Sequence, residues 1–385
     1  MLAALRTPDG SAALAAADAL ADKDPLTAAS ALRATGIDPG LAAAALTQAD
    51  LRRRARTKFG ADAARMFFTR AGLEQATRQQ VAARRAERLR KAGVTRLADL
   101  GCGIGADAIA AARAGIAVTA IDADSLTAAI AAANMSALDL DVDVTRASAE
   151  DVDLSTVDTA FCDPARRKGS NRVFDPAAFS PSWKFVTHLA ATVPYTVLKL
   201  APGIDHALIP AGAEAEWVSV DGDVVEAAFW CGPLAQVPRR ATLFRPSPVE
   251  LTGDGATEAP VGEIARYVYD PDGAVIRAHL VASLAALLGG NLGDPTIAYI
   301  YADGRASTPY ARGYEVLEVM SFSLKRLRAA LRERGIGRLT IKKRGSALEP
   351  EQLRRDLRLE GPNELTIILT RVAGAPTVLL CQPLA

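Results

Sequence analysis

The stretch Asp99-Leu100-Gly101-Cys102-Gly103-Ile104-Gly105 decides the fold class of this chain, because it joins an apolar run at residues 96–100 to an alanine-rich helical pattern at residues 107–114. Its glycines allow the backbone to turn tightly and to approach a ligand closely. A strand, a glycine loop and a helix in this order are typical of α/β folds that bind nucleotide cofactors. Read from Gly101 with Ala106 in the last position, the loop also fits the relaxed dinucleotide fingerprint, so the loop alone leaves the cofactor open.

The segments around the loop alternate between strand-like and helix-like patterns. Strands are expected at residues 96–100, 116–121, 142–146, 156–162 and 195–200, and helices at residues 107–114, 125–137 and 181–189. This alternation predicts a Rossmann-like α/β fold, in which helices cover both faces of a parallel sheet. Two further runs, 215–220 and 224–230, are joined by Asp221-Gly222, which predicts a hairpin next to that sheet.

Carboxylates near the loop favour a cationic nucleoside as the ligand. Asp99 lies two residues before the first glycine, where its side chain can accept from an ammonium group. Residues 99–163 contain 12 Asp/Glu against 2 Arg, a charge that suits a sulfonium and disfavours a pyrophosphate. Asp122 ends the next strand about 20 residues on and can accept from ribose hydroxyls, as it would in a dinucleotide site. We therefore expect S-adenosylmethionine to bind at this loop, on Gly101, Gly103 and Gly105.

The end of the third expected strand offers a small residue and two carboxylates, Ala149-Glu150-Asp151. Residues of this kind lie along an adenine ring in many nucleotide sites and accept from its amino group. Glu150 and Asp151 are therefore candidate cofactor ligands, and the alternative is that they form a solvated loop.

The motif Asp163-Pro164-Ala165-Arg166-Arg167-Lys168 follows the fourth expected strand. Ligands of open α/β sheets bind outside the carboxyl ends of the strands, so this motif is expected to face the reacting group. It resembles the Asp-Pro-Pro-aromatic motif of amino-methyltransferases, whose carboxylate and carbonyl oxygens accept from an exocyclic amine. The resemblance makes Asp163, Pro164 and Arg166 catalytic candidates, and Asp163 is a candidate cofactor ligand as well. Ala165 replaces the second proline of that motif, and Arg166 replaces its aromatic residue.

The three basic residues of this motif have a second possible role. Arg166, Arg167 and Lys168 are candidates to hold a phosphate or to stack on a base of the substrate. The alternative is that Asp163-Pro164 merely ends a strand and that the basic side chains are solvated.

Residues 70–245 together resemble class I S-adenosylmethionine-dependent methyltransferases. With the segments 66–77, 163–167 and 341–345, nearly the whole chain is similar to bacterial methyltransferases that carry a C-terminal THUMP-like domain. That resemblance implies an RNA substrate, because THUMP domains are RNA-binding modules. It also implies that Gln75 and Thr77 lie over the cofactor, and helix capping is the alternative role of both residues.

The patterns and the resemblance predict three parts of the chain. They are a helical N-terminal region at residues 1–70, the methyltransferase domain at 71–245 and an α+β domain at 246–385. Residues 246–262 are rich in Pro, Gly, Thr and Glu and are expected to form a linker or a long excursion. Beyond them, strands are expected at 265–269, 297–301, 338–342, 364–370 and 376–381, and helices at 274–288, 323–334 and 350–357.

The net charge of +1 hides two basic blocks, because residues 51–93 contain 13 Lys/Arg against 3 Asp/Glu and residues 325–358 contain 12 against 4. Such blocks suit a polyanionic partner such as RNA, and solvated helix faces are the alternative. In the first block, helical spacing is expected to place four basic residues on one face: Arg84, Arg85, Arg88 and Lys91. In the second block, the candidate phosphate ligands are Lys342, Lys343 and Arg344.

The remaining composition argues for a cytoplasmic protein without a metal centre. Four scattered cysteines form no paired motif, and the three histidines share no metal-ligand spacing. Neither a signal sequence nor an apolar stretch of the length that a membrane helix needs is expected. Three other functions stay open: a methyltransferase acting on a small molecule or a protein, a catalytically silent RNA-binding protein, and, ranked last, a nicotinamide dehydrogenase.

Overall fold

The computed structural model describes residues 2–20, 23–166 and 179–384. By its internal contacts the chain divides into two compact units, one of Met1–Leu200 with Trp230–Leu234 and the other of Ala201–Phe229 with Ala235–Ala385. The predicted boundary after residue 245 stays a prediction, since this division groups residues 201–229 with the C-terminal part.

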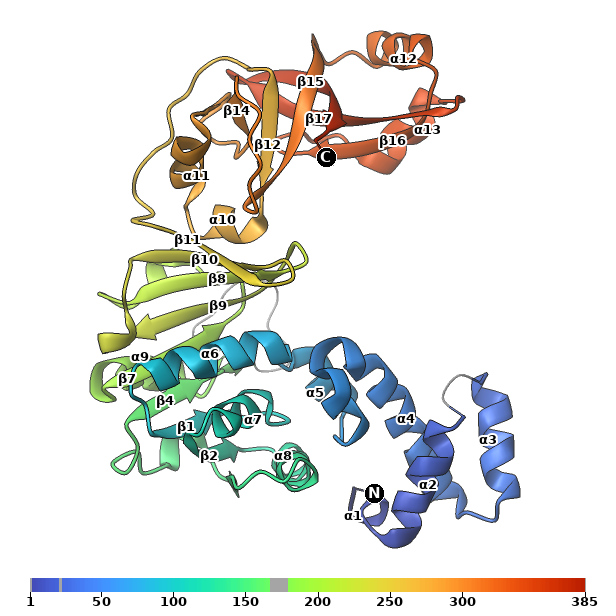
Figure 1. Ribbon diagram of the computed structural model, residues 1–385, viewed down its shortest axis with the longest axis vertical. Coiled ribbons are helices and arrows are strands. Elements are labelled where there is room, and N and C mark those ends of the chain that lie inside the picture. Colours follow the sequence, from blue (N-terminus) through green and yellow to red (C-terminus); the bar gives the residue numbers. More distant parts are fainter. Residues whose placement is uncertain (1, 21–22, 167–178, 385) are drawn as a thin grey trace. The chain divides into compact units, whose positions relative to one another are not determined.

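The first unit begins with helices only (Figure 1). They are α1 Leu2–Leu5, α2 Pro8–Asp18, α3 Pro25–Ala34, α4 Pro39–Phe59, the 3-10 turn η1 Gly60–Ala64, α5 Arg70–Gln75 and α6 Gln79–Lys91. Three of these helices start in the same way, with a proline in the first turn and a preceding side chain that accepts from free backbone N–H groups: Thr7, Asp24 and Asp38. Proline fits the first helical turn because its missing N–H would have no partner there.

A parallel sheet with the strand order β7-β4-β1-β2-β3 follows in the same unit. Its elements are β1 Arg96–Leu100, α7 Ala106–Arg113, β2 Ala117–Asp122, α8 Ser125–Ala137, β3 Asp143–Arg146, the turn η2 Ala149–Asp151, β4 Thr159–Cys162, α9 Trp183–Thr192 and β7 Tyr195–Leu200. The short strands β5 Ala165–Arg166 and β6 Phe179–Ser180 pair antiparallel, and the turn η5 spans Gly232–Leu234. The last four residues of β1 are all buried, as expected of a strand covered on both faces. The predicted Rossmann-like alternation is confirmed.

The second unit contains four strands in the order β11-β10-β8-β9. They are β8 Glu214–Val220, β9 Asp223–Cys231, β10 Arg239–Phe244 and β11 Pro248–Gly253, and the turn η4 His206–Leu208 precedes them. Asp221 and Gly222 both have positive φ, which is the backbone of the predicted two-residue turn between β8 and β9. The expected linker is partly wrong, because β11 lies inside it and pairs antiparallel with β10. The polar composition of this segment did not predict β11, because the hydrogen bonds of this strand are made with β10.

A seven-stranded sheet of order β13-β14-β12-β15-β18-β17-β16 makes the rest of the second unit. Its elements are β12 Tyr267–Pro271, α10 Gly273–Arg277, α11 Val281–Leu288, β13 Asn291–Leu292, β14 Ile300–Ala302, β15 Ala311–Ser321, α12 Leu324–Glu333, β16 Ile336–Lys343, α13 Pro350–Leu357, β17 Asn363–Val372 and β18 Ala375–Pro383. The predicted α+β domain is confirmed, although β13 and β15 were not predicted. The helix expected at 274–288 is two helices, because His279 between them has a φ of 58°.

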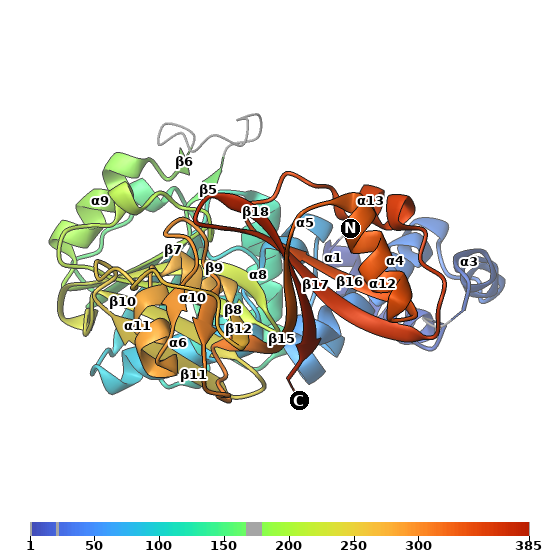
Figure 2. The same ribbon diagram turned by 90° about the horizontal axis from the view of Figure 1, so that it is seen from above.

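Two apolar clusters cover opposite faces of this sheet. Helices α12 and α13 lie against β16 (Figure 2) and bury Leu327, Leu331, Leu353 and Leu357 together with Ile367 of β17. The next residue of β17, Ile368, packs on the other face with three buried tyrosines, because successive side chains of a strand alternate between faces: Tyr299, Tyr301 and Tyr314. These tyrosines belong to the core and offer no platform for bases.

A stack of three rings in the second unit makes its stability depend on pH. The His206 ring lies between Trp217, with centroids 4.8 Å apart, and His279, with centroids 3.9 Å apart. Burial, His279 and Arg239 lower the pKa of His206 to about 4. The pKa of His206 is lower in the folded state than the ordinary value of 6.5. The neutral ring therefore contributes stability at neutral pH, and this contribution is lost as pH falls from about 6.5 toward 4.

We expect urea unfolding followed by tryptophan fluorescence to show a lower free energy of unfolding at about pH 5 than at about pH 7. The variant His206→Phe with His279→Asn removes both titrating groups, keeps a ring at position 206 against Trp217, and places at position 279 a residue that tolerates positive φ. This variant should lose most of the difference, whereas His188→Gln, at an exposed site of α9, should keep it. Equal pH dependence in all three proteins would contradict the assignment.

Candidate functional site

The glycine loop between β1 and α7 is fixed by backbone hydrogen bonds to the end of β2. Gly101 and Cys102 both donate to the carbonyl oxygen of Ile121, each at 2.9 Å. Gly101 and Gly105 have φ values of 87° and 91°, a left-handed conformation that favours glycine. The loop therefore has one defined path at the carboxyl end of the sheet, which is where ligands of this fold bind.

Gly101 also lies against the end of β4. A Cβ atom at this position would lie 3.1 Å from the carbonyl oxygen of Asp163, whereas one at Gly115 would meet no atom within 4 Å. Both glycines have positive φ, so Gly101→Ala and Gly115→Ala should each lower the free energy of unfolding by roughly 1–2 kcal/mol. Only Gly101→Ala should also weaken binding of S-adenosylmethionine in calorimetry, because only there does a methyl group press on the site. Equal affinities of the two variants would contradict this.

Asp99 is fully buried at the end of β1, and neither of its carboxylate oxygens has a hydrogen-bond partner among the residues that the structure describes. Burial raises the pKa of Asp99 well above its usual range, and the carboxylates of Asp107 and Asp163 raise it further. Arg85 and Lys199 act in the opposite direction. A buried carboxyl group without a partner costs stability, which makes Asp99 a candidate to accept from a bound ligand.

A buried ion pair borders Asp99. Arg85 of α6 donates to the Oδ1 of Asp107 at 3.0 Å, and its guanidinium lies 4.8 Å from the centroid of the Phe161 ring. The hydroxyl of Thr77 donates to the Oδ2 of Asp107 at 2.6 Å. Arg85 and Asp107 were not among the site residues predicted from the sequence. The proximity of Asp107 to the loop was the one available signal.

The basic face expected on α6 is partly wrong. Arg85 is 4% exposed, and Arg88 donates to the carbonyl oxygen of Leu234 at 2.6 Å while its guanidinium lies 3.9 Å from the Trp230 ring. Both side chains turn into the first unit because buried partners there satisfy them. They do not form a solvated phosphate-binding face.

Asp122 at the end of β2 holds the loop from the other side. Its Oδ2 accepts from the backbone N–H of Gly103 at 3.0 Å, and its Oδ1 accepts from that of Asp124 at 2.9 Å. Burial raises the pKa of Asp122, while these two backbone bonds lower it. An ionised carboxylate has about four acceptor positions, so Asp122 can bind the loop and still accept from ribose hydroxyls.

The carboxylates expected near the adenine lie on the turn η2. Ala149 is buried, and the Oε1 of Glu150 accepts from both the backbone N–H of Ser182, at 2.8 Å, and its hydroxyl, at 2.7 Å. Asp151 is exposed. Glu150 therefore ties η2 to the start of α9, a role that the sequence did not reveal.

Asp163 follows β4, and its Oδ2 forms a short ion pair with the Nζ of Lys199 on β7. The side chain of Lys199 is 13% exposed and that of Asp163 is 35% exposed. Lys199 was missed because a lysine within a strand pattern carries no local mark of its partner. Pro164 is buried, Arg166 belongs to β5, and Arg167 and Lys168 lie outside the described residues.

The segment before α6 covers the loop. Asn134 of α8 is fully buried, accepts from the N–H of Phe67 at 2.7 Å, and donates to the carbonyl oxygens of Phe67 at 3.1 Å and of Ile104 at 2.9 Å. It thereby joins this segment to the glycine loop. Lys58 donates to three carbonyl oxygens at the end of α5, those of Leu73, Glu74 and Ala76.

The two candidates on this segment differ. Thr77 is buried and bonded to Asp107, whereas Gln75 is exposed as the last residue of α5. The N-cap of α6 is Arg78, and no side chain caps that helix. Neither candidate therefore caps the following helix, while contact with a cofactor stays a prediction for both.

The basic run of the second unit is engaged in ion pairs. Lys342 and Arg344 both bind the carboxylate of Asp270, each at 2.9 Å, and Lys343 binds Glu349 at 2.9 Å. These pairs reduce the charge available to a phosphate. The role of the run in RNA binding stays a prediction.

Comparison with known proteins agrees with this geometry. A methyltransferase domain model matches residues 97–167, which include the glycine loop and Asp163, and a THUMP domain-like model matches residues 311–383. The chain carries a methyltransferase domain and a C-terminal THUMP-like domain. The predicted family resemblance is thus confirmed. A domain of unknown function matches residues 1–55.

Two curated relatives are uncharacterized S-adenosylmethionine-dependent methyltransferases from Mycobacterium tuberculosis strains CDC 1551 and H37Rv. Each is 35% identical over 232 residues, which are 57% of this chain and 63% of the relative. The chain thus matches just under two thirds of their length. A crystal structure from Porphyromonas gingivalis W83, assigned as a methyltransferase, superposes with a TM-score of 0.75 and 24% identity over 91% of this chain and 92% of that chain, and so shares the fold.

Membrane insertion and metal binding concern the described chain as a whole. Among the described residues, no helix is long and apolar enough to cross a membrane. In the same part of the chain, no group of three or more His, Cys, Asp or Glu side chains is arranged to hold a metal ion.

Proposed function

We propose that the chain transfers the methyl group of S-adenosylmethionine to a base of RNA. The observation that carries the cofactor assignment is Asp99, a fully buried carboxyl group without a partner among the described residues, at the foot of the glycine loop. An ammonium group of the cofactor would supply the missing donor. The methyltransferase relatives support this assignment, and the match to a THUMP-like domain supports RNA as the substrate.

Bound S-adenosylmethionine supplies a methyl group on a positively charged sulfur, so the chain's own residues need only bind and orient. In this proposal, Asp99 accepts from the ammonium group and Asp122 from the ribose hydroxyls. Glu150 and Asp151 lie along the adenine, and Gln75 and Thr77 lie over the ligand. The acidic surroundings of the loop stabilise the sulfonium.

At the acceptor side, the carboxylate of Asp163 and the carbonyl oxygen of Pro164 accept from an exocyclic amine and point its nitrogen lone pair at the methyl group. The ion pair with Lys199 orients the Asp163 carboxylate for this role. Arg166, with Arg167 and Lys168, is proposed to hold a neighbouring phosphate or to stack on the base. Lys342, Lys343 and Arg344 of the second unit are proposed to bind phosphates of the RNA backbone away from the methylated base.

The test combines binding with methyl transfer. Calorimetry should show binding of S-adenosylmethionine, and the protein should transfer tritiated methyl groups to RNA from a strain that lacks the gene. Asp163→Asn should weaken cofactor binding less than it lowers methyl transfer, and transfer should fall by about 10–100-fold, as expected for loss of one charged hydrogen-bond acceptor. A folded protein that binds no S-adenosylmethionine would refute the proposal, and transfer only to protein or small molecules would refute RNA.

We also infer a cytoplasmic location. All four cysteines are buried free thiols, as expected in a reducing compartment. Non-reducing mass spectrometry of protein taken directly from cells should find all four thiols unpaired. A disulfide there would contradict the inference.

A further inference from the structure

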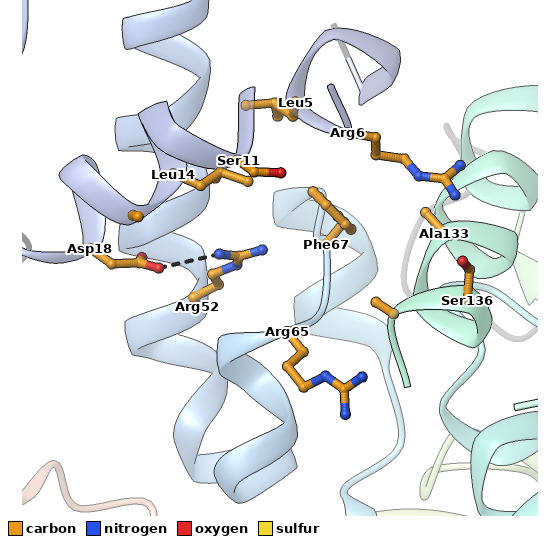
Figure 3. A pocket seen from close by; sticks show the side chains of 12 residues that line it. Leu5, Arg6, Ser11, Leu14, Asp18, Arg52, Arg65, Phe67, Ala133 and Ser136 are labelled. Atoms are coloured by element: carbon orange, nitrogen blue, oxygen red, sulfur yellow. Dashed lines mark hydrogen bonds and ion pairs between the residues drawn. The ribbon is translucent and has the colours of Figure 1, made fainter. Parts of the chain in front are cut away.

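A cavity of about 430 Å³ lies in the first unit, between the N-terminal helices and α8 (Figure 3). Its walls come from the end of α1, from α2, from α4, from the segment after η1 and from α8. It thus lies between residues that match a domain of unknown function and residues that match the methyltransferase domain. Its volume suits a nucleotide-sized ligand.

The cavity is lined by three arginines, Arg6, Arg52 and Arg65, and by one carboxylate, Asp18. Figure 3 shows Arg6 extending toward Ala133 of α8 and Arg52 directed toward Phe67. Three guanidinium groups against Asp18 and against Asp139, which pairs with Arg65, still leave an excess of positive charge at this opening. Such an excess attracts an anion.

The three arginines are held to different degrees. Arg52 is fixed, because its Nε donates to the carbonyl oxygen of Met66 at 3.0 Å and one Nη pairs with Asp18 at 3.3 Å. Arg65 pairs with the exposed Asp139 at 2.7 Å, and its own side chain is 54% exposed. Arg6 is exposed and makes no ion pair with any described residue. The cavity thus combines one fixed guanidinium with two exposed ones, which can adapt to an anion.

The chemistry of the lining favours a phosphate. Guanidinium groups bind phosphate oxygens through paired N–H donors, and the exposed hydroxyls of Ser11 and Ser136 add further donors. Phe67 is 7% exposed and lies 5.3 Å below the Arg52 guanidinium, so its ring is covered and a base would not stack there. The lining residues can therefore recognise the phosphate of a nucleotide, but they offer no aromatic surface for its base.

We propose that this cavity binds a phosphate group of a nucleotide, carried either by the RNA substrate or by a free nucleotide. The RNA form of the proposal rests on the proposed function. Asn134 bonds both to Phe67, which lines the cavity, and to Ile104 of the glycine loop, so an RNA phosphate bound here would lie in a fixed position relative to the methyl donor.

The test compares two double variants. Arg6→Gln with Arg65→Gln removes the two exposed guanidinium groups of the cavity. Arg33→Gln with Arg53→Gln removes the same charge from exposed positions of α3 and α4 that do not line the cavity. Calorimetry with S-adenosylmethionine should give the same affinity for both variants and for the unchanged chain, which shows that each is folded.

Binding of a labelled single-stranded RNA, of AMP and of inorganic phosphate is then measured at several salt concentrations. We expect the cavity variant to lose about tenfold or more in RNA affinity, with a salt slope lower by about 1 to 2, and the control variant to change by about twofold or less. If AMP or phosphate binds and only the cavity variant loses it, the proposal holds with a free nucleotide as the source, even where RNA fails as the substrate.

Three results would overturn the proposal: equal losses in both variants, no loss in the cavity variant, or binding of none of the three ligands to the unchanged chain. Competition by polyglutamate as strong as that by RNA would also overturn it, because the site would then recognise charge and not phosphate. None of these results bears on the proposed function. That function is tested separately, by measuring whether the protein binds S-adenosylmethionine and transfers its methyl group to RNA.

Discussion

Asp99→Asn is expected to weaken binding of S-adenosylmethionine by about 10–100-fold, because a buried charge-assisted hydrogen bond contributes about 1.5–3 kcal/mol. The amide keeps the size of the side chain but cannot match the charge of an ammonium group. Calorimetry of the variant beside the unchanged chain measures the difference. Asp143→Asn, at an exposed position of β3, is the matched control and should bind normally. An unchanged affinity of Asp99→Asn would refute the role of Asp99.

The same substitution should raise the stability of the ligand-free protein. The pKa of Asp99 is raised in the folded state, so the group favours folding at low pH and this contribution is lost as pH rises through the raised pKa. Asp99→Asn has no ionisable group at this position, so its free energy of unfolding does not fall in this way as pH rises. Urea unfolding between about pH 5 and pH 8 should show the variant gaining on the unchanged chain as pH increases. A variant that is less stable at every pH would indicate a purely structural role for Asp99.

Arg85→Met is expected to lower the free energy of unfolding by about 3–5 kcal/mol, the usual cost of removing one partner from a buried ion pair. Arg85 is 4% exposed and is bonded to Asp107 beside the buried Asp99, so its loss leaves neighbouring carboxyl groups without their cation. It also removes the guanidinium that lowers the pKa of Asp99. That pKa therefore rises further, and the loss of stability should increase with pH.

A double-mutant cycle in urea tests this pair. Adding Asp107→Asn to Arg85→Met should recover part of the lost stability, because the unpaired charge is then gone. Arg90→Met on the same helix replaces an exposed arginine and should change stability little. Equal losses in the two single arginine variants, or no recovery in the double variant, would show that the buried pair does not stabilise the fold.

The features that depend on local patterns could be predicted from the amino-acid sequence. The alternation of strands and helices, the glycine loop and the carboxylates at strand ends were predictable, because apolar spacing and glycine positions record backbone conformation directly. β1 and β7 have the predicted bounds, and Asp99, Asp122 and Asp163 stand at the predicted strand ends. A strand such as β11 was missed because its pattern is polar and its hydrogen bonds come from a neighbouring strand.

Which charges are paired and which are exposed became apparent only from the packing of the folded chain. A basic run in a sequence looks the same whether its members face solvent or a buried carboxylate. The decisive contacts join residues far apart in the chain: Arg85 with Asp107, Lys199 with Asp163, and Lys342 with Asp270. Whether a charged side chain is paired or solvated depends on its partner and its burial. Both are fixed by packing between elements that are distant in the sequence, which no local pattern records.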